Sequence, residues 1–583
     1  MFRNLDPLKP YLYKYRVQFL WGGLVLLLNN LIWIFFPQVI GRAINDLNRG
    51  ITQHKIVSYS LALIAIALAK GLFQFLMRWI LIGISREIEF DLRNDLFHHL
   101  ESLSYSYYQR TRVGDIMARA TNDLNAVRML LGPAIMYTAN TIVFTAGALA
   151  FMLKISPRLT MFAFLPLPAA SILVQYFGRR IHERFERIQA TFSDISARAQ
   201  ENFSGARLVR AYVQEEPEIE LFETANREYI ARSLKLVRLI GMLWPTLEML
   251  LGLAIILVLW LGGREVLLHR MNVGDFVAYN TYMVQLTWPV IALGWVINIF
   301  QRGTASLGRI NEIFAERPEV TDEHVAPDLK KVSAIHGDIE FRGLTFRYPT
   351  GGEVLSGIDL RIPAGTSLAI VGPTGSGKST LVSLIPRIYD AAAGSVSIDG
   401  RKIIDFPLET LRKNIGFVPQ ETFLFSSSIR DNIAFGTEQS SDAEVEAAAQ
   451  AASLAQEIHA FPQGYATVVG ERGLTLSGGQ KQRTAIARAI IRNPRILILD
   501  DALSSVDTYT EERILNHLRD IMQGRTTIFI SHRVSTVQAA DQIAVLYGGE
   551  IVELGAHEEL LSLNGYYADL YNKQLLEEEL AKV

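Results

Sequence analysis

Residues 372–379 have the residue types and the spacing of a phosphate-binding loop. The segment consists of Gly372, Pro373, Thr374, Gly375, Ser376, Gly377, Lys378 and Ser379, and it matches the pattern G-x-x-x-x-G-K-S/T. An apolar run, 367–371, predicts a strand before it, and a helical pattern starts at Thr380. Glycines let backbone N–H groups curve around phosphates, and a helix N-terminus favours negative charge. We therefore expect this segment, the phosphate loop, to bind a nucleotide such as ATP, with Lys378 on its terminal phosphates and Ser379 on Mg²⁺.

A second apolar run, 495–499, ends in an acidic residue, Asp500. Nucleotide-binding sheets place the carboxylate that holds Mg²⁺, in part through water, at such a position. A strand that ends in aspartate is weak evidence alone, but it becomes strong beside the phosphate loop. Short strand and helix patterns alternate throughout this half of the chain, which predicts an α/β domain.

Residues 476–480, the signature segment, separate this chain from other nucleotide-binding proteins. They are Leu476, Ser477, Gly478, Gly479 and Gln480, they are followed by Lys481, Gln482 and Arg483, and they lie 24 residues before Asp500. Two glycines, a serine hydroxyl and a helix N-terminus make a second phosphate cradle. With these motifs the sequence resembles the ATP-binding-cassette (ABC) transporter family over essentially its whole length. The resemblance implies that the signature segment caps ATP held by a second subunit, and therefore that the protein is a dimer.

The same resemblance implies roles for five further positions. Tyr348 resembles the aromatic residue that stacks on adenine, and Gln420 resembles the glutamine that links Mg²⁺ to the membrane domain. Segment 467–473 resembles the exporter segment that contacts the partner's membrane loops, and 504–507 resembles the loop that joins the two sites. His532 resembles the histidine that contacts the γ-phosphate, although a lone histidine is more often a surface residue.

One position departs from the family pattern. The family usually has a glutamate after the magnesium aspartate, where it orients or deprotonates the attacking water, but this chain has Asp501. Aspartate is one methylene shorter, so its carboxylate retreats by about 1 Å, and a misplacement of that size can cost about 10²-fold in rate. With Asp501, His532 and Gln420 as the expected catalytic residues, we expect the chain to bind ATP but to hydrolyse it slowly.

A half-transporter with aspartate at this position resembles one member of a heterodimeric exporter. In such a pair, the signature segment would complete the active site of a partner that carries glutamate. A homodimer that tolerates aspartate is the alternative, and a membrane regulator or channel gated by ATP is a further one.

Six apolar stretches precede residue 301, each long enough to approach the roughly 20 residues that a membrane-spanning helix needs. They are 17–40, 56–85, 129–153, 159–177, 239–263 and 276–300, and four of them contain no charged residue. The long charged loops 86–128 and 178–238 are helical in pattern and extend the spans beyond the bilayer. We expect an all-α six-helix transmembrane domain at 1–316, a linker at 317–336 and an α/β nucleotide-binding domain at 337–583. The tips of the long loops, near 111–115 and 205–212, are expected to contact something outside the membrane.

Composition limits the other classes of function. The absence of cysteine excludes disulfides, zinc–cysteine sites and thiol catalysis, and a net charge of −2 gives no sign of a nucleic-acid partner. Six spans exclude a soluble cassette protein of DNA repair or translation. A half-length transporter with little sequence before its first span is typical of bacteria, which predicts the cytoplasmic membrane, with the nucleotide-binding domain in the cytosol and lipid around the spans.

The transported substrate is the least constrained property. The family resemblance implies alternating access, driven by ATP that binds the closed dimer better than the open one. Aromatic-rich spans and a single acid in the fifth span, Glu248, favour amphipathic small molecules, drug-like or lipid, while peptides stay open. Lys70 and Arg78 in the second span have either a place on the substrate pathway or a structural role.

Overall fold

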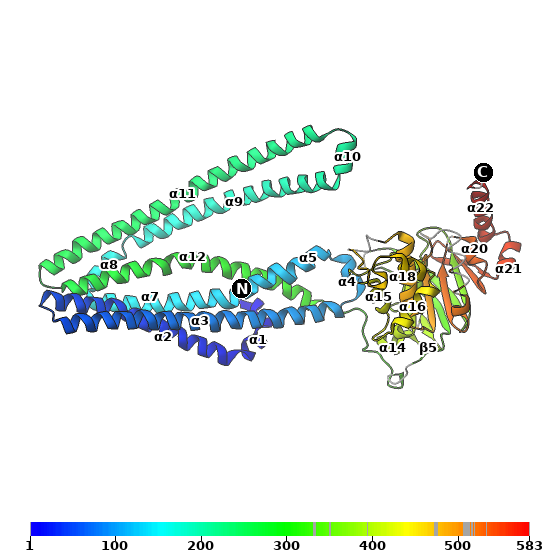
Figure 1. Ribbon diagram of the computed structural model, residues 1–583, viewed down its shortest axis with the longest axis horizontal. Helices are drawn as coiled ribbons and strands as arrows, with labels where there is room; N and C mark the ends of the chain where they lie inside the picture. Colours follow the sequence, from blue (N-terminus) through cyan, green and yellow to red (C-terminus); the bar gives the residue numbers. More distant parts are fainter. Residues whose placement is uncertain are drawn as a thin grey trace. The chain divides into compact units, whose positions relative to one another are not determined.

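A computed structural model of the protein describes residues 2–329, 334–348, 351–392, 395–470, 476–504, 514, 517, 519–531 and 533–581. The chain forms two compact units (Figure 1). The membrane unit comprises Met1–Phe97 and Met117–Ile313, and the cassette unit comprises His98–Ile116 and Phe314–Val583. Part of the first long loop therefore belongs to the same unit as the nucleotide-binding half.

The membrane unit is helical. Five helical segments among the described residues are long and apolar enough to cross a membrane: Arg16–Asn48, Gln53–Ser102, Val113–Ile155, Glu215–Leu267 and Val273–Ala315. The elements up to Ala315, apart from α4, are η1 (Phe2–Leu8), α1 (Lys9–Lys14), α2 (Arg16–Asn48), α3 (Gln53–Ser102), α5 (Val113–Ala118), η2 (Arg119–Asp123), α6 (Leu124–Met129), η3 (Leu130–Ala134), α7 (Ile135–Ile155), α8 (Pro157–Ala163), α9 (Leu167–Ser204), α10 (Ala206–Ala211), α11 (Glu215–Leu267) and α12 (Val273–Ala315).

The predicted fourth span, 159–177, is present as two helices. Helix α8 ends at Ala163, a turn follows at 164–166, and α9 begins at Leu167. Pro166 lies in this turn and Pro168 lies in the first turn of α9. Proline has no N–H for a helical hydrogen bond, so it is tolerated in the first turn of a helix and interrupts a helix elsewhere. The apolar run therefore predicts the span but not its break.

A tight contact fixes the start of the third span against the second. Residues Leu130–Ala134 have π-helical geometry and include Pro133, whose missing N–H such a wider turn accommodates. A Cβ atom on Gly132 would lie 2.5 Å from Oγ of Ser85 in α3, so only glycine allows this approach. Small residues at a contact between membrane helices let the backbones come close.

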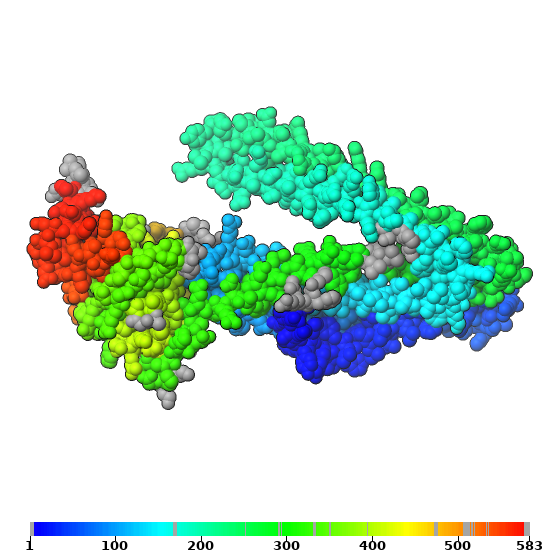
Figure 2. Space-filling view, turned by 180° about the vertical axis from the view of Figure 1, so that it is seen from behind, coloured from blue at the N-terminus to red at the C-terminus, as the bar shows by residue number. Residues whose placement is uncertain are grey.

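Helices α9, α10 and α11 form an arm. The two long helices run side by side and are joined by α10, and towards α10 they diverge from the rest of the membrane unit (Figure 1). Figure 2 shows the same separation in the space-filling view. The tip carries exposed apolar side chains: Phe203, Tyr212 and Val213 are 82%, 71% and 78% exposed. An apolar surface of this kind indicates a place where another chain packs.

The cassette unit contains two sheets. The six-stranded sheet has the order β10-β9-β3-β8-β7-β6, with β3 (Ser367–Val371), β6 (Ile415–Val418), β7 (Ile496–Asp500), β8 (Thr526–Ile530), β9 (Gln542–Tyr547) and β10 (Glu550–Gly555). All neighbouring pairs are parallel except β9 and β10. Strands β3, β7 and β8 are buried along their whole length, which explains why their sequences are mostly apolar and do not alternate with polar residues. The α/β prediction is confirmed.

The second sheet is four-stranded and antiparallel, with the order β2-β1-β4-β5. Its strands are β1 (Ile339–Arg347), β2 (Glu353–Ile362), β4 (Val396–Ile398) and β5 (Arg401–Lys402). The helices of the unit are α4 (Tyr105–Arg110), α13 (Lys378–Ser383), α14 (Leu408–Lys413), α15 (Ile429–Ala434), α16 (Asp442–Ala451), α17 (Ala455–Ala460), α18 (Gly478–Ile490), α20 (Val534–Val537), α21 (His557–Ser562) and α22 (Tyr566–Ala581), with the short helices η5 (Ile403–Asp405) and η6 (Gly464–Ala466).

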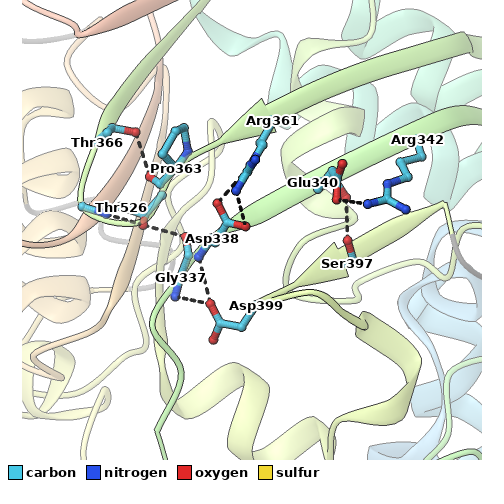
Figure 3. Close-up of polar contacts among 11 residues, drawn as sticks. Gly337, Asp338, Glu340, Arg342, Arg361, Pro363, Thr366, Ser397, Asp399 and Thr526 are labelled. Carbon is cyan, nitrogen blue, oxygen red and sulfur yellow. Dashed lines mark hydrogen bonds and ion pairs between the residues drawn. The ribbon is translucent and has the colours of Figure 1, made fainter.

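A polar junction joins the two sheets just before β1 (Figure 3). The Asp399 carboxylate accepts hydrogen bonds from Gly337 N at 2.9 Å and Asp338 N at 3.0 Å. The Thr526 hydroxyl, at the start of β8, donates to Gly337 O at 2.7 Å. The entry to β1, the strand that leads to Tyr348, is thus attached to the β4–β5 turn of one sheet and to β8 of the other. Strand β8 pairs with β3, the strand that leads to the phosphate loop.

Helix α4 lies on the cassette unit through its own N-terminus and side chains. The Ser104 hydroxyl accepts hydrogen bonds from Glu319 N at 2.8 Å and Val320 N at 2.9 Å. The Tyr105 ring lies 6.1 Å from the Tyr389 ring, centroid to centroid. The contact is made by residues just before the predicted loop tip at 111–115.

Candidate nucleotide site

The phosphate loop follows β3 with a backbone that only glycine can adopt at its critical points. Gly372 has φ +144°, and a Cβ atom there would lie 2.0 Å from Leu546 O. Gly377 has φ +102°, and its Cβ atom would lie 2.8 Å from Leu355 Cδ2. Pro373, Thr374 and Gly375 form the exposed apex between them. The two glycines therefore set the curvature of the loop, as the sequence predicts.

The polar groups inside this loop fit a phosphate ligand. The Lys378 ammonium donates to Gly372 O at 2.9 Å and Pro373 O at 2.8 Å, so it lies across the loop. The pKa of Lys378 is lowered from its usual value, because the effect of burial is larger than the opposing effect of the nearby Asp500 and Asp501 carboxylates. Ser376 Oγ is buried and has no hydrogen-bond partner among the described residues. A buried unpaired hydroxyl is unfavourable, and a phosphate oxygen is a group that would satisfy it.

Ser379 and Asp500 meet directly. Ser379 Oγ donates to Asp500 Oδ1 at 3.0 Å, which connects the start of α13 to the end of β7. Asp500 is almost completely buried, and a hydroxyl beside a carboxylate is a donor set that Mg²⁺ accepts. The residues thus fit the predicted metal: Ser379 and Asp500 would hold the ion, which supplies charge neutralisation to phosphates when it is bound.

Three expected catalytic residues come after the ends of β6, β7 and β8. Val418 pairs with Leu499 in the parallel register, so Gln420 follows β6 at the sheet edge where β7 ends in Asp500, and it is exposed there. Asp501 is partly exposed, has φ +48°, and donates its N–H to Ile530 O at 3.1 Å. His532 lies outside the described residues, as do 471–473 of the predicted segment 467–473 and 505–507 of the predicted segment 504–507. The catalytic roles of these residues stay predictions.

Tyr348, the expected adenine-stacking residue, is attached to the phosphate-loop helix. Its hydroxyl lies 2.9 Å from Thr380 Oγ1, which itself is buried in α13. The Tyr348 ring packs edge-on against Phe346 and Tyr389, with centroid distances of 5.1 Å and 5.2 Å. This half-buried ring thus has a fixed position beside the loop, while its contact with adenine stays a prediction.

The signature segment forms the start of α18. Ser477 Oγ accepts from Gln480 N at 3.2 Å, and Gln480 Oε1 accepts from Ser477 N at 2.9 Å, a reciprocal capping box. Ser477 and Gly478 are exposed and Gly479 is buried. The exposed start of this 13-residue helix presents the cradle to the outside of the chain, where a second subunit would meet it.

Sequence reasoning missed the residues that hold these motifs in place. The Glu457 carboxylate accepts hydrogen bonds from Gln480 at 2.9 Å and Arg483 at 2.6 Å, which attaches α17 to the signature segment. Tyr389 supports Tyr348, and Gln482 reaches the loop after β7. No spacing pattern connects these residues along the chain, because each contact depends on how separate elements pack.

Comparison with known families agrees with these observations. A family model described as "ABC transporter transmembrane region" matches residues 19–290, and one described as "ABC transporter" matches residues 355–504. A solved structure titled "Structure of a bacterial Atm1-family ABC exporter with ATP bound" is similar to 96% of this chain and 98% of its own, with a TM-score of 0.78 and 30% sequence identity.

Several bacterial proteins are similar over most of the chain. YheI of Bacillus subtilis (strain 168), a probable multidrug resistance ABC transporter ATP-binding/permease protein, is 37% identical over 99% of this chain and 98% of its own. The multidrug resistance-like ATP-binding protein MdlA of Escherichia coli (strain K12) is 36% identical over 93% and 92%. An ATP-dependent lipid A-core flippase of Syntrophus aciditrophicus (strain SB) is 38% identical over 90% and 86%.

The membrane helices, the phosphate loop and the signature segment are thus accompanied by full-length similarity to exporters. The chain belongs to the ABC transporter family, as a multi-pass membrane protein with an exporter fold and an ATP-hydrolysing nucleotide-binding domain.

Proposed function

We propose that this chain is one subunit of a heterodimeric exporter, and that its own site binds ATP and Mg²⁺ but hydrolyses ATP slowly. The observation that carries the proposal is Asp501, which stands where the family usually has glutamate. Lys378, Ser379 and Asp500 retain the chemistry of binding, so the substitution affects the water-activating step alone. The intact signature segment then completes the site of a partner that carries glutamate.

Two exposed apolar surfaces support a second subunit. One is the tip of the arm, where the side chains of Phe203, Tyr212 and Val213 are exposed in the single chain. The other is an aromatic cluster on the cassette unit, Phe423, Phe425 and Phe435, which are 52%, 40% and 64% exposed. Apolar patches of this kind mark protein–protein contacts, and exporters of this family work as dimers.

The composition of the complex in its native membrane tests the heterodimer. A tagged copy of the chain, extracted in mild detergent, is expected to bring with it a second ABC half-transporter in about equal amount. Mass spectrometry identifies that protein, and its sequence is expected to have glutamate after the magnesium aspartate. A preparation in which the tagged chain pairs only with untagged copies of itself would support the homodimer instead.

For the substrate, we propose amphipathic small molecules, drug-like or lipid, which are moved out of the cytosol or the inner leaflet. The relatives include proteins named for multidrug resistance and for lipid A-core flipping, and their names support both drug-like and lipid substrates. Glu248 is exposed on α11 in the single chain, where it is available to a cationic group. Lys70 instead lies 3.5 Å from the centre of the Trp33 ring, so it has a cation–π partner within the membrane unit.

Glu248→Gln is expected to lower transport of a cationic substrate about tenfold, the equivalent of about 1.4 kcal/mol of lost attraction. ATP-dependent uptake into inverted vesicles of the native membrane, which hold the chain together with any partner, would be measured with a fluorescent amphipathic cation and with a short-chain fluorescent phospholipid. Glu220→Gln, an exposed position of α11 outside the predicted span, is the matched control. Equal uptake of the cation by wild type and Glu248→Gln would remove the assigned role, and absence of any ATP-dependent uptake would favour a regulator over a pump.

A further inference from the structure

Helix α18 connects two places where chemistry is expected. Its N-cap and first turn carry Ser477–Gln480 of the signature segment, which the proposed function places against a second subunit, and its second turn passes the loop that follows β7. Gln482 makes the second connection: its Nε2 atom lies 3.0 Å from Ser504 Oγ and 3.4 Å from Asp501 O. Gln482 is only 5% exposed, so its amide depends on protein partners for its hydrogen bonds.

The loop that Gln482 reaches holds Asp501 in a conformation that needs support. Asp501 has φ +48°, in the left-handed region, which is unfavourable for a residue with a side chain by roughly 1–2 kcal/mol. Its N–H donates to Ile530 O at 3.1 Å, and its carbonyl oxygen accepts from Ser504 Oγ at 3.0 Å. Gln482 contacts both members of the second bond. A strained backbone conformation persists only where contacts from the surrounding structure hold it in place, and at Asp501 these contacts include Gln482 of α18.

The other end of this connection is equally well fixed. The capping box links Ser477 to Gln480, and Glu457 binds both Gln480 and Arg483. Gln482 lies five residues after Ser477, which corresponds to about 7.5 Å along a helix. Over so short a helical distance, a displacement of the signature segment is transmitted to Gln482 with little loss.

We propose that Gln482 is a positioning residue for Asp501, and that through it α18 couples the partner's nucleotide, at the signature segment, to the carboxylate of this chain's own site. When a partner's nucleotide draws Ser477 and Gly478 inward, Gln482 moves with them and resets the Asp501–Ser504 loop. The proposal deepens the proposed function, and it rests on that function in assigning the water-activating role to Asp501.

The test compares Gln482→Met with wild type, and repeats the comparison in the Asp501→Glu background, using the full chain purified in lipid. Methionine keeps the length of the side chain and removes its donor. In the more active background, kcat for ATP is expected to fall about tenfold, less than the about 10²-fold that a displacement of 1 Å can cost, while KM for ATP changes less than about twofold. Gln450→Met, an exposed glutamine of α16, is the matched control and is expected to leave both constants unchanged.

Hydrogen exchange supplies a readout that does not depend on turnover. The amide of Asp501 is expected to exchange about tenfold faster in Gln482→Met, because its loop opens more readily, whereas residues 484–490 of α18 keep their protection. If Gln482→Met does not fold, Ser504→Ala removes the same contact from the other side. In the double variant the two effects are expected to be less than additive, since both remove one interaction.

The outcomes separate this inference from the proposed function. An unchanged kcat in the active background, for Gln482→Met and for Ser504→Ala, overturns the positioning role whatever the exchange rates are. A wild type that already turns over as fast as Asp501→Glu contradicts the slow-site proposal. In that case the comparison of Gln482→Met with wild type, without Asp501→Glu, tests the role of Gln482. A rise in KM without a change in kcat also overturns the inference, because it would place Gln482 in nucleotide binding.

Discussion

Lys378→Ala is expected to lower the affinity of the chain for Mg·ATP by about 10²–10³-fold. The ammonium group lies across the phosphate loop on Gly372 O and Pro373 O, the position from which it reaches a terminal phosphate. Hydrogen bonds to a charged group contribute about 1.5–3 kcal/mol each, and about 1.4 kcal/mol corresponds to a tenfold change in affinity. The expected range corresponds to about 2.8–4.2 kcal/mol, in the lower part of the about 3–6 kcal/mol that two such bonds to phosphate oxygens would contribute.

Equilibrium binding of a fluorescent ATP analogue to the full chain in lipid measures this effect. Lys402→Ala, an exposed lysine of β5, is the matched control and is expected to bind like wild type. Melting temperatures of the three proteins exclude unfolding as the cause. If Lys378→Ala binds within about threefold of wild type, Lys378 does not contact the terminal phosphates.

The local part of the site was predictable from sequence because its signals are local. The strand, the loop and the helix around Lys378 follow one another along the chain, and glycine positions report backbone geometry directly, as Gly372 and Gly377 show. Asp500 ends a continuous apolar run that the structure shows as the buried strand β7. Ser477 and Gln480 form a capping box whose three-residue spacing is visible in the sequence.

The long-range part was not predictable because packing decides it. Gln482 contacts Ser504 only because α18 packs against the end of β7, and the spacing of the two residues along the chain does not predict this contact. Tyr389 joins α4 to Tyr348 for the same reason. In the membrane unit, hydropathy predicts an uninterrupted fourth span. Hydropathy measures apolar character only, and it does not register that Pro166 and Pro168 have no N–H for a helical hydrogen bond.

Asp501→Glu is expected to raise the ATPase rate of the purified chain in lipid about 10²-fold. Glutamate extends the carboxylate by about 1 Å towards the water that attacks the terminal phosphate, while Ser379 and Asp500 keep their positions. The left-handed backbone at 501 is more favourable for aspartate than for most residues, so we expect a stability loss of about 1 kcal/mol, visible as a lower melting temperature. Asp569→Glu, an exposed position of α22, controls for the added methylene.

The most direct test of the slow-site account is therefore the ATPase rate of the chain alone, measured side by side for wild type and Asp501→Glu at saturating Mg·ATP. The account predicts a wild type close to background and a variant with transporter-like turnover, at similar KM. A wild type that already turns over rapidly, with no gain from glutamate, would contradict it and make an active homodimer the better description of this exporter.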